Sequence, residues 1–182
     1  ASRELNPGFH QRCETGKPWL RLKLASSLDG RIAAADGSSQ WITGPEARAD
    51  GQYWRARASK IVTGAATVRS DNPRLDVRLA EAQRQPQRVI LSRTFDVSPS
   101  AHIFAEPGEA CVYAPMSDAS DAAVEEKREL LAAAGINTHL GPHHDDQLDL
   151  HELIGRWGRE GANELHFECG AVLAGQLLAQ DL

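Results

Sequence analysis

The sequence predicts an α/β fold with a mainly parallel sheet and helices on both faces. Short apolar segments alternate with segments that have helix start and stop signals along most of the 182 residues, and strands that alternate with helices form parallel sheets. Apolar residues make up 41% of the chain and charged residues 25%, as in ordinary globular domains. The length suits one domain with a substantial core.

Each element is predicted from a local pattern. Leucines at alternate positions of residues 20–24 predict a strand with one apolar and one basic face. Thr43, with Glu46 three residues later, fits a capping box, so we expect a helix from Pro45 to about residue 58. Further strands are expected at 60–63, 88–92, 110–114, 136–140 and 164–168, and further helices at 65–69, 121–134, 149–159 and 170–180.

Residues 1–18 are interpreted as a lead-in, because the turn signals at 6–8 and 16–18 interrupt them and no sustained period joins the two. The domain itself is expected over 19–182. The sequence ends after a predicted helix, where an α/β unit normally continues into a strand, so we expect the C-terminal strands to be missing. With no apolar run of about 18 residues and no secretory signal, we expect a cytoplasmic protein without a membrane span.

Charge and cysteine content exclude several classes of protein. Three cysteines without a C-x-x-C pair argue against a disulfide framework and a zinc knuckle. A net charge of −5 argues against a nucleic-acid binder. Residues 1–93 nevertheless carry 16 basic and 9 acidic side chains, and 94–182 carry 4 and 16. Either the first half binds an anion, or the two halves face each other in the fold.

Three predicted strands end in residues suited to ligand binding, and ligands of open α/β sheets bind at the carboxyl ends of strands. These ends are at residues 63–67, at Ser92 and at 168–175. In the last, Gly170 would let a phosphate approach the free N–H groups of a helix start. A simple tight turn is the alternative, because neither a G-x-G-x-x-G nor a Walker pattern is present. Glu168 fits either proton transfer or a solvated strand end.

Other chemistries are not favoured. The run at 143–146, His-His-Asp-Asp, has the composition of a metal site, but Gly141-Pro142 precedes it and indicates a surface loop. We therefore expect no metal. The chain has no G-x-S-x-G pattern, which excludes an α/β-hydrolase nucleophile. No cysteine has an activating partner in its neighbourhood, so a catalytic thiol is not expected.

Several stretches in the same order resemble the reductase domain of the bacterial bifunctional riboflavin-biosynthesis deaminase/reductase. They are residues 23–33 (KLASSLDGRIA), 39–43 (SQWIT), 67–68, 71–78 (DNPRLDVR) and 168–175 (ECGAVLAG). Residues 3–9 (RELNPGF) resemble the joint to the upstream deaminase domain. The resemblance covers nearly the whole chain and is weakest over 94–160. It implies that 1–18 is the linker from an absent deaminase domain.

The resemblance also implies a dihydrofolate-reductase-like fold and a reaction. The reaction is NADPH-dependent reduction of 5-amino-6-(5-phosphoribosylamino)uracil to the 5-phosphoribitylamino product. Hydride would pass from the nicotinamide to the ribose C1′ after ring opening to an imine. The protein's task is then to hold two phosphorylated molecules with their reacting carbons adjacent. Lys23, Glu168 and a bound water remain alternatives for the proton donor.

Matched positions imply the site residues. Arg55 and Arg78 would hold the substrate phosphate, and Glu168 would face the polar end of the substrate. The implied substrate positions are Lys23, Asp29, Ser39, Arg55, Leu75, Arg78 and Glu168. The implied cofactor positions are Ala25, Trp41, Thr67, Asp71, Ser92, Gly170, Ala171, Val172, Leu173, Ala174, Gly175 and Gln176.

The chain departs from the family pattern in two respects. Ala171-Val172 replaces the Pro-Thr that many relatives have, which removes a hydroxyl from the expected phosphate site. The deaminase zinc motif is absent, so deamination is not expected. The family also implies a homodimer. Two other interpretations remain open at the sequence level: a non-catalytic nucleotide-binding or assembly remnant, and a related reductase with another pyrimidine or pterin substrate.

Overall fold

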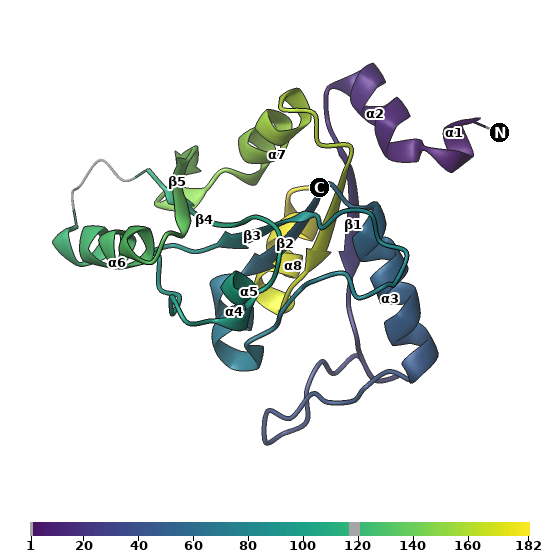
Figure 1. Ribbon diagram of the computed structural model, residues 1–182, viewed down its shortest axis with the longest axis horizontal. Helices are drawn as coiled ribbons and strands as arrows, with labels where there is room; N and C mark the ends of the chain where they lie inside the picture. The colour runs from purple at the N-terminus through teal and green to yellow at the C-terminus, as the bar shows by residue number, and fades with distance from the viewer. Residues whose placement is uncertain (1, 117–120) are drawn as a thin grey trace.

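The computed structural model describes residues 2–116 and 121–182 (Figure 1). Its centre is a six-stranded sheet in the order β1–β8–β2–β3–β4–β5, and every pairing is parallel. This confirms the predicted α/β fold. The strands are β1 (Trp19–Lys23), β2 (Lys60–Gly64), β3 (Gln87–Leu91), β4 (Ala110–Pro115), β5 (Asn137–Gly141) and β8 (Glu164–Glu168).

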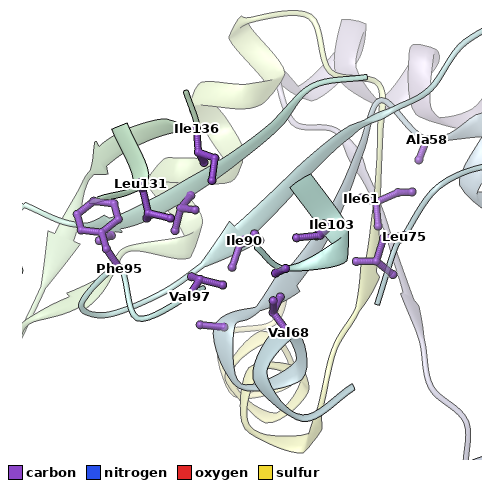
Figure 2. Packing of buried hydrophobic residues seen from close by; sticks show 14 residues of the cluster. Ala58, Ile61, Val68, Leu75, Ile90, Phe95, Val97, Ile103, Leu131 and Ile136 are labelled. Carbon is purple, nitrogen blue, oxygen red and sulfur yellow. The ribbon is translucent and has the colours of Figure 1, made fainter. Parts of the chain in front are cut away.

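Helices cover both faces of this sheet, and each face has its own apolar cluster. Ile61, Ile90 and Val112 pack on one face against side chains of α4, α5 and α6 (Figure 2). On the other face, Val62 and Val89 pack with α7 and α8. The helices are α1 (Ser2–Leu5), α2 (Pro7–Thr15), α3 (Pro45–Arg57), α4 (Ala65–Asp71), α5 (His102–Ala105), α6 (Ala122–Ala133), α7 (Leu150–Arg159) and α8 (Ala171–Ala179).

The strand order creates a switch point beside β2. Strands β2 to β5 are added to the sheet in sequence order, whereas β8 returns to the opposite side of β2. The connections that leave β2 and β8 therefore lie next to each other at the carboxyl ends of the strands. Open α/β sheets bind ligands at such points.

The lead-in is more regular than its turn signals indicate, because residues 2–15 are mostly helical. Asn6-Pro7 does not break the chain into irregular structure. Instead, Pro7 occupies the first turn of α2, where a missing N–H costs nothing. Helix α2 packs at the start of β8, where Arg12 Nε donates to Asn163 Oδ1 over 2.7 Å. The lead-in is thus packed against the domain.

The predicted capping box at Thr43 is wrong. Gly44 is the N-cap of α3, and no side chain accepts a hydrogen bond there. The carbonyl oxygen of Thr43 instead accepts from Arg48 Nη1 over 2.5 Å. Pro45 still sets the helix start, as predicted, because its fixed φ suits the first turn.

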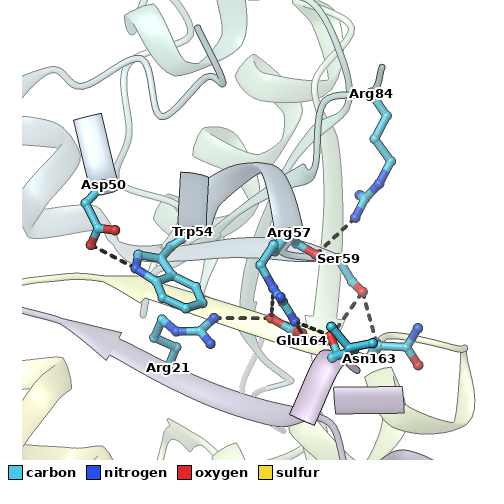
Figure 3. A network of polar contacts seen from close by, with 9 residues as sticks. Arg21, Asp50, Trp54, Arg57, Ser59, Arg84, Asn163 and Glu164 are labelled. Carbon is cyan, nitrogen blue, oxygen red and sulfur yellow. Dashed lines mark hydrogen bonds and ion pairs between the residues drawn. The ribbon is translucent and has the colours of Figure 1, made fainter. Parts of the chain in front are cut away.

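Helix α3 packs through charged and aromatic side chains. Although every residue of α3 is described, none is fully buried. Arg57 of α3 and Arg21 of β1 both pair with Glu164 at the start of β8, at 2.7 and 3.2 Å (Figure 3). The Arg21 guanidinium also lies 3.8 Å from the ring centroid of Trp54. Burial opposes ionisation of Glu164, but the two arginines outweigh it and lower the pKa of this carboxyl.

Apart from α1 and α2, a single helical turn and a hairpin have no counterpart among the predicted elements. One is the single turn α5. The other is an antiparallel hairpin of β6 (His143–His144) and β7 (Gln147–Leu148), in the segment expected to be a surface loop. Asp145 and Asp146 connect its strands with φ of 49° and 57°, the sign that a type I′ turn requires. Within the described residues, no helix has the length and apolarity to cross a bilayer.

Candidate functional site

A cavity of about 590 Å³ opens at the switch point. Its lining comes mainly from the segments that directly follow three strands: 64–69 after β2, 91–96 after β3 and 170–176 after β8. Residues of the β6–β7 hairpin and the start of α7 complete it. This volume lies in the range of small-molecule and cofactor sites. The cavity therefore has the location and size expected for a nucleotide site.

The start of α8 gives one wall of the cavity an affinity for anions. Gly170 is the N-cap, with extended backbone and no side chain to occupy the first N–H groups of the helix. These N–H groups and the helix dipole favour negative charge. Thr67 and Ser92 add hydroxyls to the lining. The Ser92 Oγ accepts from the backbone N–H of Asp96 over 3.2 Å, which holds the loop after β3 in place.

The structure brings most of the implied cofactor positions together. Thr67, Ser92, Gly170, Ala171, Val172, Leu173 and Gln176 all line the cavity. Of the others, Ala174 is buried on the core side of α8, Gly175 is exposed on the same helix, and Asp71 is exposed at the end of α4. Ala25 and Trp41 belong to the long connection between β1 and α3. The roles of all these residues remain predictions.

Several lining residues lie outside the set that the resemblance implies. Arg69 and Arg93 place positive charge at the cavity, and Arg69 also forms an ion pair with Asp96 at 3.3 Å. The sequence does contain a signal for Arg69, in the excess of arginines over residues 1–93. Gln147 and Leu148 come from β7, and their hairpin has no Asn-Gly or Asp-Gly signal that would have indicated it.

A second cluster lies just beyond the end of β8. Arg55 of α3 binds Glu168 through two parallel hydrogen bonds from one edge of its guanidinium. Nε donates to Oε1 at 2.5 Å, and Nη2 donates to Oε2 at 2.9 Å. Lys23 Nζ, from the end of β1, lies 4.0 Å from Oε2. Burial disfavours the charged carboxylate, but Arg55 and His166 outweigh this effect and hold the pKa of Glu168 well below its usual range. Glu168 is therefore an anion at neutral pH.

The segment from Leu75 to Arg78 reaches the same cluster. The Asp76 carbonyl accepts from Arg55 Nη1 over 3.1 Å. The backbone N–H of Arg78 donates to Gln52 Oε1 of α3 over 2.8 Å, and the Arg78 side chain is 3.8 Å from Asp76. Four of the implied substrate residues, Lys23, Arg55, Arg78 and Glu168, therefore gather at one end of the sheet. Buried Leu75 adjoins them through Asp76.

The remaining two implied substrate residues lie elsewhere in the structure. Asp29 and Ser39 line a separate hollow within residues 27–42, together with Trp41. Asp29 is paired with Arg31 at 3.0 Å. The connection between β1 and α3 thus carries its own group of polar and aromatic side chains.

Metal-binding side chains do not converge in the part of the chain that the structure describes. No group of three or more histidine, cysteine, aspartate or glutamate residues there has the arrangement of a metal site. His143 and His144 are successive residues of β6, and Asp145 and Asp146 form its turn.

Known proteins resemble this chain in sequence. Residues 18–182 match the family model described as the RibD C-terminal domain. The riboflavin biosynthesis protein RibD of Escherichia coli is 38% identical over 191 residues, which cover 98% of this chain and 49% of that protein. The chain spans about half the length of the curated relatives that it matches at nearly full coverage.

Solved structures agree with these relatives. Acinetobacter baumannii RibD superposes with a TM-score of 0.81 at 34% identity, over 99% of this chain and 48% of that one. A Thermotoga maritima deaminase/5-amino-6-(5-phosphoribosylamino)uracil reductase gives 0.78 at 27% identity, over 98% and 46%. The dihydrofolate-reductase-like fold that the resemblance implies is thereby confirmed. Its fold agrees with that of these solved structures, and the family match covers nearly all of its length. The chain therefore belongs to the RibD C-terminal domain family.

Proposed function

We propose that this domain reduces 5-amino-6-(5-phosphoribosylamino)uracil to 5-amino-6-(5-phosphoribitylamino)uracil with NADPH, in riboflavin biosynthesis. One observation carries the proposal. The anion-favouring cavity and the Lys23–Arg55–Glu168 cluster flank the end of the same strand, because Glu168 ends β8 and Gly170 begins the next helix. Two phosphorylated molecules bound in these places would meet at the end of β8.

The residues of the cavity fit a nicotinamide dinucleotide. The free N–H groups at the start of α8 suit its pyrophosphate. Thr67 and Ser92 offer hydroxyls. Arg69 and Arg93 supply positive charge for the additional phosphate that distinguishes NADPH from NADH. When bound, the cofactor would supply the hydride, and the protein's task is to hold and orient it.

The second cluster suits the substrate. Arg78 is exposed enough to reach a phosphate, and Arg55 retains N–H groups beyond those that Glu168 and Asp76 use. Glu168 would accept hydrogen bonds from the pyrimidine. Because Arg55 keeps the pKa of Glu168 low against the effect of burial, this carboxylate has no proton to give. Lys23, whose ammonium lies beside it, is the better proton donor.

We also propose that this domain follows a deaminase domain in a cytoplasmic, homodimeric protein. Relatives of about twice the matched length support the upstream domain. Residues 1–18, of which 3–9 resemble the interdomain joint, would lead from it. The homodimer rests on the family resemblance alone.

The test is a steady-state assay of the chain with NADPH, in which consumption of the reduced nicotinamide is followed by absorbance. We expect turnover with 5-amino-6-(5-phosphoribosylamino)uracil and a much higher KM for the same compound without its phosphate. Arg78→Ala should remove that preference. Saturable cofactor binding without turnover would favour the non-catalytic interpretation. Equal KM values for the two substrates would show that Arg55 and Arg78 do not bind phosphate.

A further inference from the structure

His166 occupies an unusual place in the middle of β8. Its side chain is 1% exposed, and its neighbours across the sheet are Arg21 on β1 and Ile61 on β2. Among the described residues, neither ring nitrogen makes a hydrogen bond of good geometry. An uncompensated polar group in the core costs free energy, and leucine would fill this position without that cost. The imidazole therefore calls for an explanation beyond packing.

The nearest polar group is the carboxylate of Glu168. Residues 166 and 168 point to the same face of the sheet because strand side chains alternate. Nε2 of His166 lies 3.3 Å from Oε1 of Glu168. The same oxygen accepts the hydrogen bond from Arg55 Nε. The second oxygen, Oε2, faces Lys23. Lys23 is 42% exposed, whereas His166 is 1% exposed.

The two oxygens of Glu168 therefore have different surroundings. Arg55 bonds to both oxygens, but Oε1 is also approached from inside the protein by His166, whereas Oε2 faces the more open side, where Lys23 lies. A carboxylate gripped by Arg55 alone keeps a freedom to tilt about that pair. The His166 contact on Oε1 comes from β8 and adds to the grip of Arg55 from α3, and it removes this freedom.

We propose that His166 is a positioning residue, whose Nε2–H donates to Oε1 of Glu168 and thereby directs Oε2 toward Lys23 and the substrate. The inference rests on the proposed function only in treating Glu168 as a substrate contact. It requires a proton on Nε2.

The first test reads that proton directly and needs no turnover. In ¹⁵N-histidine-labelled chain, the ring signals of His166 are identified by their disappearance in His166→Gln. We expect the correlations between ring nitrogens and ring carbon-bound protons to show a protonated Nε2. In Glu168→Gln we expect the signals of the His166 ring to change. A bare Nε2 with the proton on Nδ1 would overturn the proposal, whether or not the chain is an active reductase.

The second test asks whether His166 acts through Glu168. In His166→Leu we expect the KM for the pyrimidine substrate to rise about tenfold, as for loss of a charge-assisted hydrogen bond, with NADPH binding unchanged. His166→Gln, which keeps a donor, should recover most of the affinity. In a Glu168→Gln background His166→Leu should add nothing.

An equal KM increase in both backgrounds, or a parallel loss of NADPH binding, would instead show a merely structural role for His166. Because the glutamine variant preserves the polar character of the site, it keeps the test decisive even if the leucine variant folds poorly. Absence of turnover in the unmodified chain would count against the proposed function, and the ring-proton measurement would still decide the role of His166.

Discussion

Glu168 has more polar partners than its position at a strand end would lead one to expect. Arg55, His166 and Lys23 come from α3, β8 and β1, and all approach its two oxygens. The side chain is 11% exposed, so the ion pair with Arg55 is only weakly screened by solvent. Loss of the carboxylate would leave the Arg55 guanidinium partly buried without its counter-ion.

We therefore expect Glu168→Gln to lower the free energy of unfolding by about 3 kcal/mol at neutral pH. The folded pKa of Glu168 lies below its usual value, so its contribution to stability is complete from about one pH unit above that usual value and declines as the pH falls toward the folded pKa. The difference in Tm between the two proteins should be constant from about pH 8 to pH 5.5 and then narrow.

Thermal unfolding of both proteins from about pH 8 to below pH 5.5 measures this difference in Tm. Glu129→Gln, on the exposed side of α6, is the matched control and should leave Tm nearly unchanged. A difference between the unmodified chain and Glu168→Gln that widened in acid would contradict the assigned ion pair.

A second residue-scale prediction concerns Val172, in the first turn of α8. Its side chain is 80% exposed and lines the cavity. Val172→Thr has nearly the same shape and adds a donor beside the expected phosphate. NADPH should bind about fivefold more tightly, the equivalent of one net hydrogen bond. Val172→Ala is the control, and equal Kd values for the threonine variant and the unmodified chain would place the phosphates elsewhere.

At the scale of elements, the lead-in is held by close approaches of backbone. The segment between α2 and β1 crosses α7 at Gly158, where an added Cβ would lie 2.2 Å from the Gly16 carbonyl oxygen. Glycine is therefore required at position 158 by the packing of two segments distant in the sequence. Gly155, in the same helix, would meet only the flexible end of Arg159 at 3.4 Å.

Gly158→Ala should accordingly lower the free energy of unfolding by about 2 kcal/mol, the usual cost of overpacking. Gly155→Ala should stabilise the chain by up to about 1 kcal/mol, because alanine is the better helix former. Denaturant unfolding of the pair measures both. Equal effects of the two substitutions would show that the lead-in does not pack against α7.

The elements predicted from the sequence are those whose local signals agree with their burial. Strand β8 has the predicted bounds of 164–168, and four of its five residues are buried. Helix α7 begins one residue after Asp149, where the predicted helix starts. Asp149 caps the helix by accepting a hydrogen bond from the backbone N–H of Glu152. The fold class followed from such segments.

The elements that were missed depend on contacts far along the chain. Helix α2 lacks a sustained period because it packs through Gly8 and Arg12 at residues 163–164. The β6–β7 turn uses two aspartates at positive φ where glycine would be the usual signal. Similarly, the resemblance identified Arg55 and Glu168, but no local pattern indicated that they pair with each other or that His166 lies beside them.

At the scale of the whole molecule, the charge asymmetry has a structural explanation. Basic side chains from residues 1–93 pair with carboxylates from the second half, including Arg57 with Glu164, Arg55 with Glu168 and Arg74 with Glu106. The two halves do face each other, one of the two alternatives that the sequence left open. Arg93 and Arg69, the latter paired with Asp96, line the cavity, so the basic half also places positive side chains there.

The strand order makes the cavity and the Glu168 cluster neighbours, and the central claim is that this cavity binds the cofactor. The most direct measurement is a titration of the chain with NADPH, followed by nicotinamide fluorescence. We predict saturable binding that weakens in Thr67→Ala, and weaker binding of NADH because it lacks the phosphate for Arg69 and Arg93. A folded chain that shows no saturable binding, or binds equally well after Thr67→Ala, would contradict the assignment of the cavity.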